Sequence, residues 1–462
     1  QPPPPPHPRP HPPPHPPTPR RRRQALAHTT PLHPSTAQGA ADDLPPAHST
    51  EYWARPDPPT GVERLLWITP KWPLPATDGA RQATTQLVSA VCSKGVTVDL
   101  LAIVPQGESV SESEAIEVLG VRSASVVRRP KPGHELLLRN LLRRPRQALT
   151  LSQYSTKALA ETVSQAASRA GTVVVFDGLH SAAWVQERVG WPTRSSVYRA
   201  HNVEADLWFR GASQRRGLMA RLLAWQGRAV QRFEAMVCAR ARVVFTVSDA
   251  DKVRFQEVAA TANIETLPIG LEAKPQSAVP PEDDQLLFIG RLDWPPNRDG
   301  LEWFLTRVWP KVTRPFVLNI VGSGDGGWLA PYLEDSRIRF LGEVDSVEPY
   351  YHSAIVNLVP IFYGSGTRVK AIESSLFARA CLGTERGVEG LGLDPQLDYF
   401  RAESELEWIE SLNTLDAEDA RQRGQAALAR VATRFDRDRI ADQFLETLRA
   451  SLREGQVTDA GA

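Results

Sequence analysis

Residues 363–373 combine a glycine-rich turn, two cations and an acid within eleven positions. Gly364 and Gly366 let the backbone approach a ligand closely, and the free amides at the start of a following helix favour an anion. Arg368 and Lys370 add positive charge beside those amides. The spacing therefore predicts a site for a diphosphate.

The same segment predicts a strand, a turn and a helix. The apolar run at 354–360 is typical of a buried parallel strand, and Thr367 is a suitable N-cap for the helix that follows the turn. Glu373 lies further along that helix, where a carboxylate accepts hydrogen bonds from the vicinal hydroxyls of a ribose or hexose. The alternative is an ordinary strand-turn-helix unit with a solvated charged face.

The composition is that of a globular protein of two to three domains. The chain has 462 residues and a formal net charge of only +1, so no global field recruits nucleic acid. Cys92, Cys238 and Cys381 have no pairing or metal-ligand spacing, which favours a reducing compartment. No apolar run has the length of a membrane span or a secretory signal, so we expect a cytoplasmic protein.

The order of apolar runs predicts an α/β protein with two Rossmann-like doubly wound domains facing a cleft. Residues 1–61, rich in proline, are expected to be disordered. The predicted parts that follow are an amino-terminal domain at 62–272, a linker at 273–284, a second domain at 285–435, and a helix and tail at 436–462. Strands are expected at 64–69, 96–104, 172–177, 195–200, 242–247, 286–290, 316–321, 338–341 and 354–360.

Ligands of such sheets bind beyond the carboxyl ends of the strands. The turns at Gly290, Gly322 and Gly364 are therefore expected to converge on one cleft. In the first domain, residues Val203 to Ala239 predict a long helical stretch rich in arginine, and Ser248 predicts the cap of the next helix.

Four motifs of the second half resemble the GT-B glycosyltransferases of group 1, family four, and within them the sugar transferases of bacterial exopolysaccharide systems. The resemblance extends over about residues 64–452 and includes the stretch His201-Asn-Val-Glu. The motifs are Phe288-Ile-Gly-Arg-Leu-Asp-Trp-Pro-Pro-Asn, Val321-Gly-Ser-Gly-Asp, Gly364-Ser-Gly-Thr-Arg-Val-Lys and Gly387-Val-Glu-Gly-Leu.

The resemblance implies roles for individual residues. Arg291 would contact the donor diphosphate, and either Arg298 or Lys370 would supply a second cation. Glu373 matches the acid that binds the ribose. Ser365 occupies the position of the family's other glutamate, so the resemblance does not identify the donor sugar. The predicted donor-binding residues are Gly79, Gly290, Arg291, Gly322, Gly364, Ser365, Gly366, Thr367, Arg368 and Glu373.

Three polar residues of the first half follow predicted strands and are candidates for chemistry at the acceptor. Asp177 and His180 follow one strand, and His201 follows the next. Histidine suits proton transfer near neutral pH, and a carboxylate either receives the hydroxyl proton or orients the histidine. The alternative for each is a structural hydrogen bond. With Arg291, Lys370 and Glu373, these three complete the predicted catalytic set.

No metal and no other cofactor is expected. Asp249 and Asp251 stand where acids favour a helix start, and Asp325 has no ligand pattern around it. The family resemblance implies that cations and amides stabilise the leaving group, with the nucleotide-sugar as a co-substrate.

The predicted function is transfer of a sugar, with retention of configuration, from a nucleotide-sugar to a glycan or lipid-linked acceptor in cell-surface or exopolysaccharide biosynthesis. The alternatives are a nucleotide-sugar epimerase of the same fold and a non-catalytic scaffold or nucleic-acid-binding protein that uses Arg20–Arg23 and the arginine-rich helices. Arginines among apolar residues predict a peripheral contact with the anionic inner face of the cell membrane, and the alternative is a solvated helix face. These arginines are Arg139, Arg143, Arg144, Arg146, Arg210, Arg215, Arg216, Arg221, Arg228 and Arg232.

Overall fold

A computed structural model describes most of the chain after residue 61. The described residues are 62–130, 148–155, 157–167, 171–187, 191, 196–274, 282, 284–364 and 367–460. The predicted disordered segment at 1–61, the four arginines from 139 to 146, and Ser365 and Gly366 lie outside the described residues.

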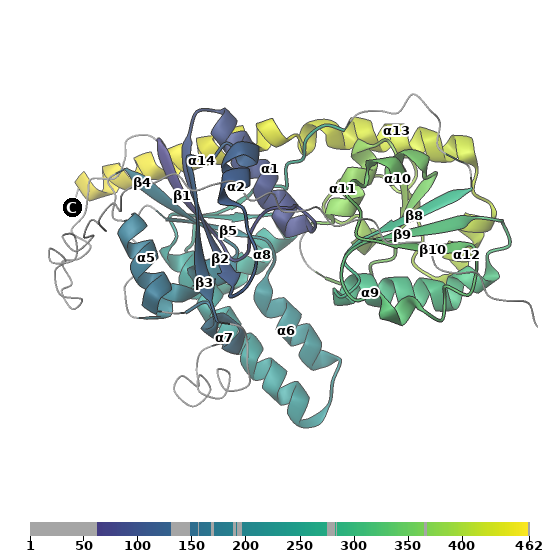
Figure 1. The fold of residues 1–462 in the computed structure, drawn as a ribbon, viewed down its shortest axis with the longest axis horizontal. Helices are drawn as coiled ribbons and strands as arrows, with labels where there is room; N and C mark the ends of the chain where they lie inside the picture. Colours follow the sequence, from purple (N-terminus) through teal and green to yellow (C-terminus); the bar gives the residue numbers. More distant parts are fainter. Residues whose placement is uncertain are drawn as a thin grey trace, which may run out of the picture. The chain divides into compact units, whose positions relative to one another are not determined.

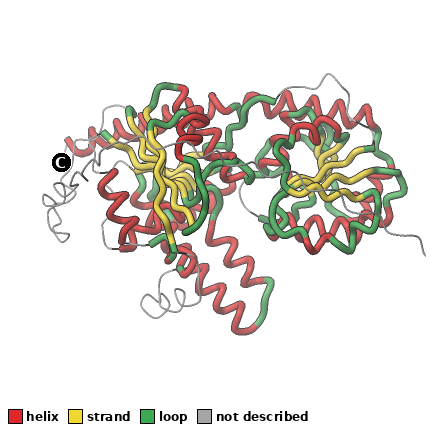
Figure 2. Tube along the Cα trace, viewed as in Figure 1, coloured by secondary structure: helices red, strands yellow, loops and turns green. Residues whose placement is uncertain are grey.

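Two parallel sheets with helices on both faces form the described chain (Figures 1 and 2), which confirms the predicted α/β class. The first sheet has the strand order β3-β2-β1-β4-β5-β6-β7 and the second has the order β10-β9-β8-β11-β12-β13. The strands of the first sheet are β1 (Arg64–Thr69), β2 (Thr97–Pro105), β3 (Ser123–Arg129), β4 (Thr172–Asp177), β5 (Ser196–Ala200), β6 (Val243–Thr246) and β7 (Ile264–Thr266). Those of the second are β8 (Gln285–Ile289), β9 (Val317–Val321), β10 (Ile338–Gly342), β11 (Val356–Val359), β12 (Ala380–Gly383) and β13 (Phe400–Arg401).

Successive side chains of a strand point to opposite faces of the sheet, so the first sheet contributes to two separate hydrophobic cores. Leu65 and Trp67 of β1 face one core, and Leu66 and Ile68 face the other. The first core is completed by α1 (Gly79–Ser93), α2 (Glu112–Leu119) and α14 (Arg437–Ala460). The second is completed by α4 (Leu149–Ser152), α5 (Lys157–Ala167), η2 (Leu179–Glu187), α6 (Glu204–Ser213), α7 (Gly217–Arg240) and α8 (Asp249–Val258).

The second sheet is covered in the same way. Leu286 and Phe288 of β8 face a core shared with α9 (Pro295–Trp303), η3 (Phe304–Val308), η4 (Trp309–Lys311) and α12 (Glu405–Asn413). The opposite face packs against α10 (Glu348–Ser353), α11 (Val369–Leu376) and α13 (Ala417–Arg434). Two short 3-10 helices, η5 (Gly327–Leu329) and η6 (Glu385–Gly387), lie in the loops.

The last helix, α14, returns to the first sheet. Its Phe444 lies 5.8 Å from Trp67 and 5.1 Å from Phe245, measured between ring centroids. The sequence predicts a terminal helix here, but the periodicity of that helix says nothing of its partner.

Four strands, β3, β7, β12 and β13, were not predicted. Strand β3 is partly exposed and ends in two arginines, and β7 and β13 contain only three and two residues, so none has the long apolar run of a central strand. The stretch from Val203 to Ala239 is helical, as predicted. It forms two helices, α6 and α7, which are separated at residues 214–216 before Gly217, whose φ is 69°.

Gly300 allows α9 to pack directly on the end of β11, and we predict that this position tolerates no side chain. A Cβ at residue 300 would lie 1.7 Å from the carbonyl oxygen of Pro360. Gly300→Ala should therefore lower the free energy of unfolding by about 3 kcal/mol or more, measured by urea titration.

Gly211 of α6 provides the matched control. A Cβ at residue 211 would meet only Arg215 Nη1 at 3.6 Å and Leu223 Cδ1 at 3.7 Å. Gly211→Ala should therefore stabilise the protein by about 0.5–1 kcal/mol. Equal unfolding midpoints for the two variants would contradict the packing at Gly300.

Candidate functional site

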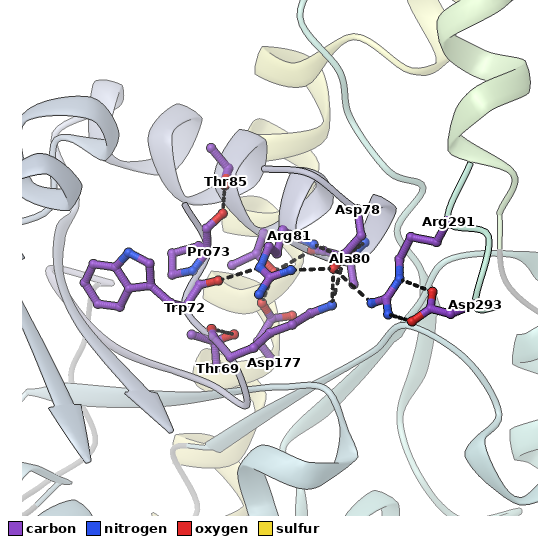
Figure 3. Close-up of polar contacts among 12 residues, drawn as sticks. Thr69, Trp72, Pro73, Asp78, Ala80, Arg81, Thr85, Asp177, Arg291 and Asp293 are labelled. Carbon is purple, nitrogen blue, oxygen red and sulfur yellow. Dashed lines mark hydrogen bonds and ion pairs between the residues drawn. The ribbon is translucent and has the colours of Figure 1, made fainter. Parts of the chain in front are cut away.

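The loop after β1 ends in a buried carboxylate that holds several cations (Figure 3). Asp78 is the N-cap of α1, and its Oδ1 accepts the backbone N–H groups of Ala80 at 3.0 Å and Arg81 at 2.9 Å. Lys71 Nζ donates to both carboxylate oxygens at 2.8 and 2.7 Å. Burial by itself would raise the pKa of Asp78, but Lys71 and the amide of Arg81 outweigh burial and hold the pKa below its usual value.

Arg291 comes from the second half and reaches the same carboxylate. Its Nη1 lies 3.8 Å from Asp78 Oδ2, and its guanidinium also donates to Asp293 at 3.0 and 2.5 Å. Figure 3 shows Arg291 between the two acids, with its guanidinium directed toward Asp78. The predicted diphosphate cation is thus held in place by two carboxylates, and it is partly exposed.

Lys370 is the second cation at this turn. Its Nζ donates to Asn297 Oδ1 at 2.8 Å and lies 4.3 Å from the centroid of the Phe288 ring. Asn297 in turn donates to the backbone carbonyl of Arg291 at 2.9 Å, so one amide joins the two predicted phosphate cations. Arg298, the alternative second cation, is exposed and lies over the Trp328 ring instead.

The glycines of the predicted turns allow two backbone segments to meet. A Cβ on Gly322 would lie 1.9 Å from the carbonyl oxygen of Gly290, and a Cβ on Gly290 would lie 3.0 Å from Lys370 Nζ. A side chain at Gly322 would therefore separate the turns after β8 and β9, and a side chain at Gly290 would displace the ends of the Asn297 and Lys370 side chains.

The first turns of α1 and α11 lie against each other. A Cβ on Gly79 would lie 3.1 Å from Val369 Cγ2, and Gln82 Nε2 donates to Glu373 Oε1 at 2.7 Å. Glu373 is buried, and burial raises the pKa of its carboxyl group. The predicted ribose acid is thus bound to a residue of the first half, a contact that no local sequence pattern predicts.

Two predicted residues beside this turn face inward. Arg368 is buried and donates from Nη2 to the carbonyl oxygen of Gly364 at 2.9 Å, and burial lowers its pKa to about 10. The prediction of Thr367 as the N-cap is wrong, because Arg368 occupies that position and the Thr367 hydroxyl donates to the carbonyl oxygen of Val247 at 3.1 Å.

Asp177, at the end of β4, is the centre of a buried hydrogen-bond network. It accepts from Trp67 Nε1 at 3.0 Å, Thr84 Oγ1 at 2.6 Å, Arg199 Nη1 at 2.8 Å and His201 Nε2 at 2.7 Å. Burial alone would raise its pKa, but His201, Arg199 and the hydrogen bonds hold it well below the usual range. A carboxylate so fully bonded is a poor proton acceptor, so the geometry favours the second predicted role, which is to orient His201.

The two candidate histidines lie in different surroundings. Because Asp177 accepts the N–H of Nε2, the His201 imidazole is fixed in orientation, and its side chain is 13% exposed. The His180 ring packs edge-on against Tyr154 with centroids 5.0 Å apart, and burial lowers the pKa of His180. His201 is therefore the better placed of the two for contact with a substrate.

The acids that were considered for a metal have structural partners. Asp249 accepts from Thr266 at 2.6 Å, Asp251 from Ser248 at 2.8 Å, and Asp325 from the backbone N–H of Gly327 at 2.9 Å. Among the described residues, no three histidine, cysteine or acidic side chains form a group that could hold a metal ion.

The sequence reading missed Lys71, Asp78, Gln82 and Asn297. Asp78 carried a usable signal, because it directly precedes a predicted helix start and aspartate is a favoured N-cap. Lys71 is the only cation of the turn at 70–78, but no spacing rule connects it to residues 200 positions away. Gln82 and Asn297 are ordinary polar helix residues in the sequence.

Residues 283–396 match the family model described as glycosyl transferases group 1. No curated protein sequence matches the chain significantly. The family match confirms the resemblance expected for the second half.

Three similar solved structures were crystallised with ligands. HepE of Anabaena, with UDP and glucose, is 13% identical with a TM-score of 0.58, and the alignment covers 84% of this chain and 100% of HepE. TarM of S. aureus, with fondaparinux, alpha-GlcNAc-glycerol and UDP, is 8% identical with a TM-score of 0.62, covering 84% and 99%. The pneumococcal O-GlcNAc transferase GtfA, with UDP and GlcNAc, is 10% identical with a TM-score of 0.58, also covering 84% and 99%. These likenesses confirm the predicted GT-B fold.

The surroundings of Lys370 predict a pH dependence of stability. Burial, followed by the nearby Arg368, lowers the pKa of Lys370 to about 7 from its ordinary value of 10.5. Between these two values the unfolded chain binds a proton that the folded protein does not, so stability rises with pH across that interval. Lys370→Met removes this contribution.

Urea titrations of both proteins at pH 6, 7.5 and 9 would measure the effect. The unfolding free energy of the wild type relative to that of Lys370→Met should increase as the pH increases. Parallel stability curves across this interval would show that the lysine is not held in the neutral form.

Proposed function

We propose that the protein is a glycosyltransferase that moves a sugar from a nucleotide-sugar donor to a glycan or lipid-linked acceptor. The match of residues 283–396 to the group 1 glycosyltransferases and the GT-B fold support this proposal. The observation that carries the proposal is the gathering of Arg291, Lys370 and Glu373 around the start of α1. The neighbours HepE and GtfA, each solved with UDP, support a nucleotide as the ligand of this site.

The donor would lie with its diphosphate beside Arg291 and Lys370 and its ribose near Glu373. Arginine offers paired, charge-assisted hydrogen bonds to phosphate, and a lysine held partly neutral by burial regains its charge when an anion binds. Ribose hydroxyls would share Glu373 with Gln82, which donates to it at 2.7 Å.

The cations also suit the chemical step. As the bond between sugar and diphosphate breaks, negative charge develops on the leaving phosphate oxygen, and fixed cations stabilise that charge without reorganisation. We propose that this occurs without a resident metal and with retention of configuration, by analogy with the family.

His201 is proposed to contact the acceptor from the first half. Asp177 holds its imidazole through Nε2, so the ring has one orientation when an acceptor hydroxyl arrives. A glycan or lipid-linked saccharide of cell-surface or exopolysaccharide biosynthesis is the acceptor class that we propose.

A nucleotide-sugar panel tests the function. Thermal stabilisation by one of the UDP-, GDP- or ADP-sugars should identify the donor, and the same donor should then be consumed only when an acceptor is present. Donor isomerisation without an acceptor would instead indicate an epimerase, and indifference to every nucleotide would contradict the proposal.

Two substitutions test the site. Arg291→Met and Glu373→Gln should each reduce the transfer rate by about 100-fold or more, because each removes a charged contact to the donor, while the unfolding midpoint changes little. Arg401→Met, at an exposed arginine paired with Glu403 and Glu385, is the control and should leave the rate unchanged. Normal rates in both site variants would rule out this donor site.

We also propose that the arginine hairpin, defined as α6 and α7 (residues 204–240), contacts the anionic inner face of the cell membrane. Figure 1 shows these two helices projecting from the first sheet. Residues 207–233 contain six arginines and no acid. At the tip, Leu218 is 83% exposed, and Met219 and Leu222 are also exposed. No described helix is long and apolar enough to cross a membrane.

Co-flotation with vesicles tests this contact. The wild type should float with phosphatidylglycerol vesicles and much less with neutral phosphatidylcholine vesicles, because six arginines attract anionic headgroups. The double variant Leu218→Asp, Met219→Asp should bind at least about tenfold more weakly, and Leu406→Asp, at a leucine 75% exposed on α12, is the matched control. Equal flotation of both variants would contradict docking through the tip.

A further inference from the structure

Three cations meet at one carboxylate oxygen where the two halves touch. Lys71 Nζ lies 2.7 Å, Arg81 Nη1 3.0 Å and Arg291 Nη1 3.8 Å from Asp78 Oδ2. Asp78 is only 8% exposed at its side chain, whereas Lys71 and Arg291 are 33% and 42% exposed. Two of the three cations are thus open to a second anion beside the carboxylate.

Arg81 differs from Lys71 in how it is held. Its Nε donates to the carbonyl oxygen of Trp72 at 2.9 Å, so its guanidinium braces the loop as well as the carboxylate. The bonds of the Lys71 ammonium given above go to the two oxygens of Asp78. An ammonium has three N–H groups, so Lys71 has the capacity to bind a further oxygen.

Charge also favours an anion at this point. Burial lowers the pKa of Lys71 even though Asp78 opposes that shift, so one carboxylate does not fully compensate the ammonium. Lys71, Arg81 and Arg291 carry three positive charges against the two negative charges of Asp78 and Asp293.

We propose that Lys71 is a further ligand of the donor diphosphate, contributed by the first half of the chain opposite Arg291. This inference rests on the proposed function. The terminal phosphate lies between Lys71 and Arg291, and Asp78 keeps the ammonium in position by sharing it with a phosphate oxygen.

The arrangement has a consequence for the reaction. When the bond between the sugar carbon and the diphosphate oxygen breaks, the electron pair stays on that oxygen. The acceptor hydroxyl oxygen forms the new bond to the sugar carbon, and its proton passes to the solvent. The diphosphate gains one negative charge in this step, so Lys71 binds the product more strongly than the donor.

Binding measurements with Lys71→Met test the inference. The probe is whichever of UDP, GDP and ADP binds the wild type most tightly, compared with its own monophosphate by calorimetry. Loss of Lys71 should lower the affinity for the diphosphate by about tenfold or more, which is the range expected for a hydrogen bond to a charged group. The affinity for the monophosphate should fall by less than about twofold. Lys94→Met, which removes a lysine paired with Asp442 at the other end of α1, should change neither.

Asp78→Asn separates a ligand role from a structural one. Asparagine keeps the helix cap but removes the competing negative charge, so diphosphate binding should become tighter by a few fold while Lys71→Met makes it weaker. If Lys71 only supported the loop, both variants would weaken the diphosphate and the monophosphate alike, and that result would overturn the inference.

The outcomes distinguish this inference from the function on which it rests. If the wild type and Lys71→Met bind a nucleoside diphosphate equally well, the role of Lys71 is contradicted but the proposed function is not. If the wild type binds none of the three nucleotides, both the role of Lys71 and the proposed function are contradicted.

Discussion

The packing of the α1 start against the second half is the contact on which the rest of the site depends. Asp78 satisfies two amides that would otherwise lack partners at the helix terminus, and the same carboxylate neutralises Lys71 and stands close to Arg291. Four residues along the helix, Gln82 reaches Glu373. One helix terminus thus places cations and an acid of both halves within reach of a single ligand.

A buried ion network fixes that terminus to the first sheet. Asp177 of β4 joins Thr84 of α1, Arg199 of β5 and His201. Charges buried in this way stabilise a structure only when they are fully paired, and loss of one partner leaves an uncompensated charge. The network therefore couples the position of α1 to the orientation of His201, although the two contact different parts of the proposed substrate pair.

In the second half, the close approach of two backbone turns likewise fixes the positions of the site residues. The turns at Gly290 and Gly322 approach so closely that neither position has room for a side chain, and Asn297 binds both the Arg291 carbonyl and Lys370. Lys370 is consequently buried against the Phe288 ring, and burial, followed by the nearby Arg368, lowers its pKa to about 7. A bound diphosphate would supply the charge that this environment lacks.

Much of the fold was predictable because alternating apolar runs and glycine turns are local signals. The central strands, the α/β class and the GT-B resemblance all rest on patterns within about 10–20 neighbouring residues. The candidate donor residues Arg291 and Glu373 were also named from short motifs. The predictions for Ser365 and Gly366 fall on residues that the structure does not describe.

Local sequence patterns therefore establish the order of the elements and the types of side chain at their ends. Tertiary structure alone decided that α14 packs on the first sheet through Phe444, that Gln82 meets Glu373, and that Arg368 turns inward. The physical reason is that these contacts join residues far apart in the chain. Burial and partner geometry select such contacts, and no local spacing or propensity encodes them.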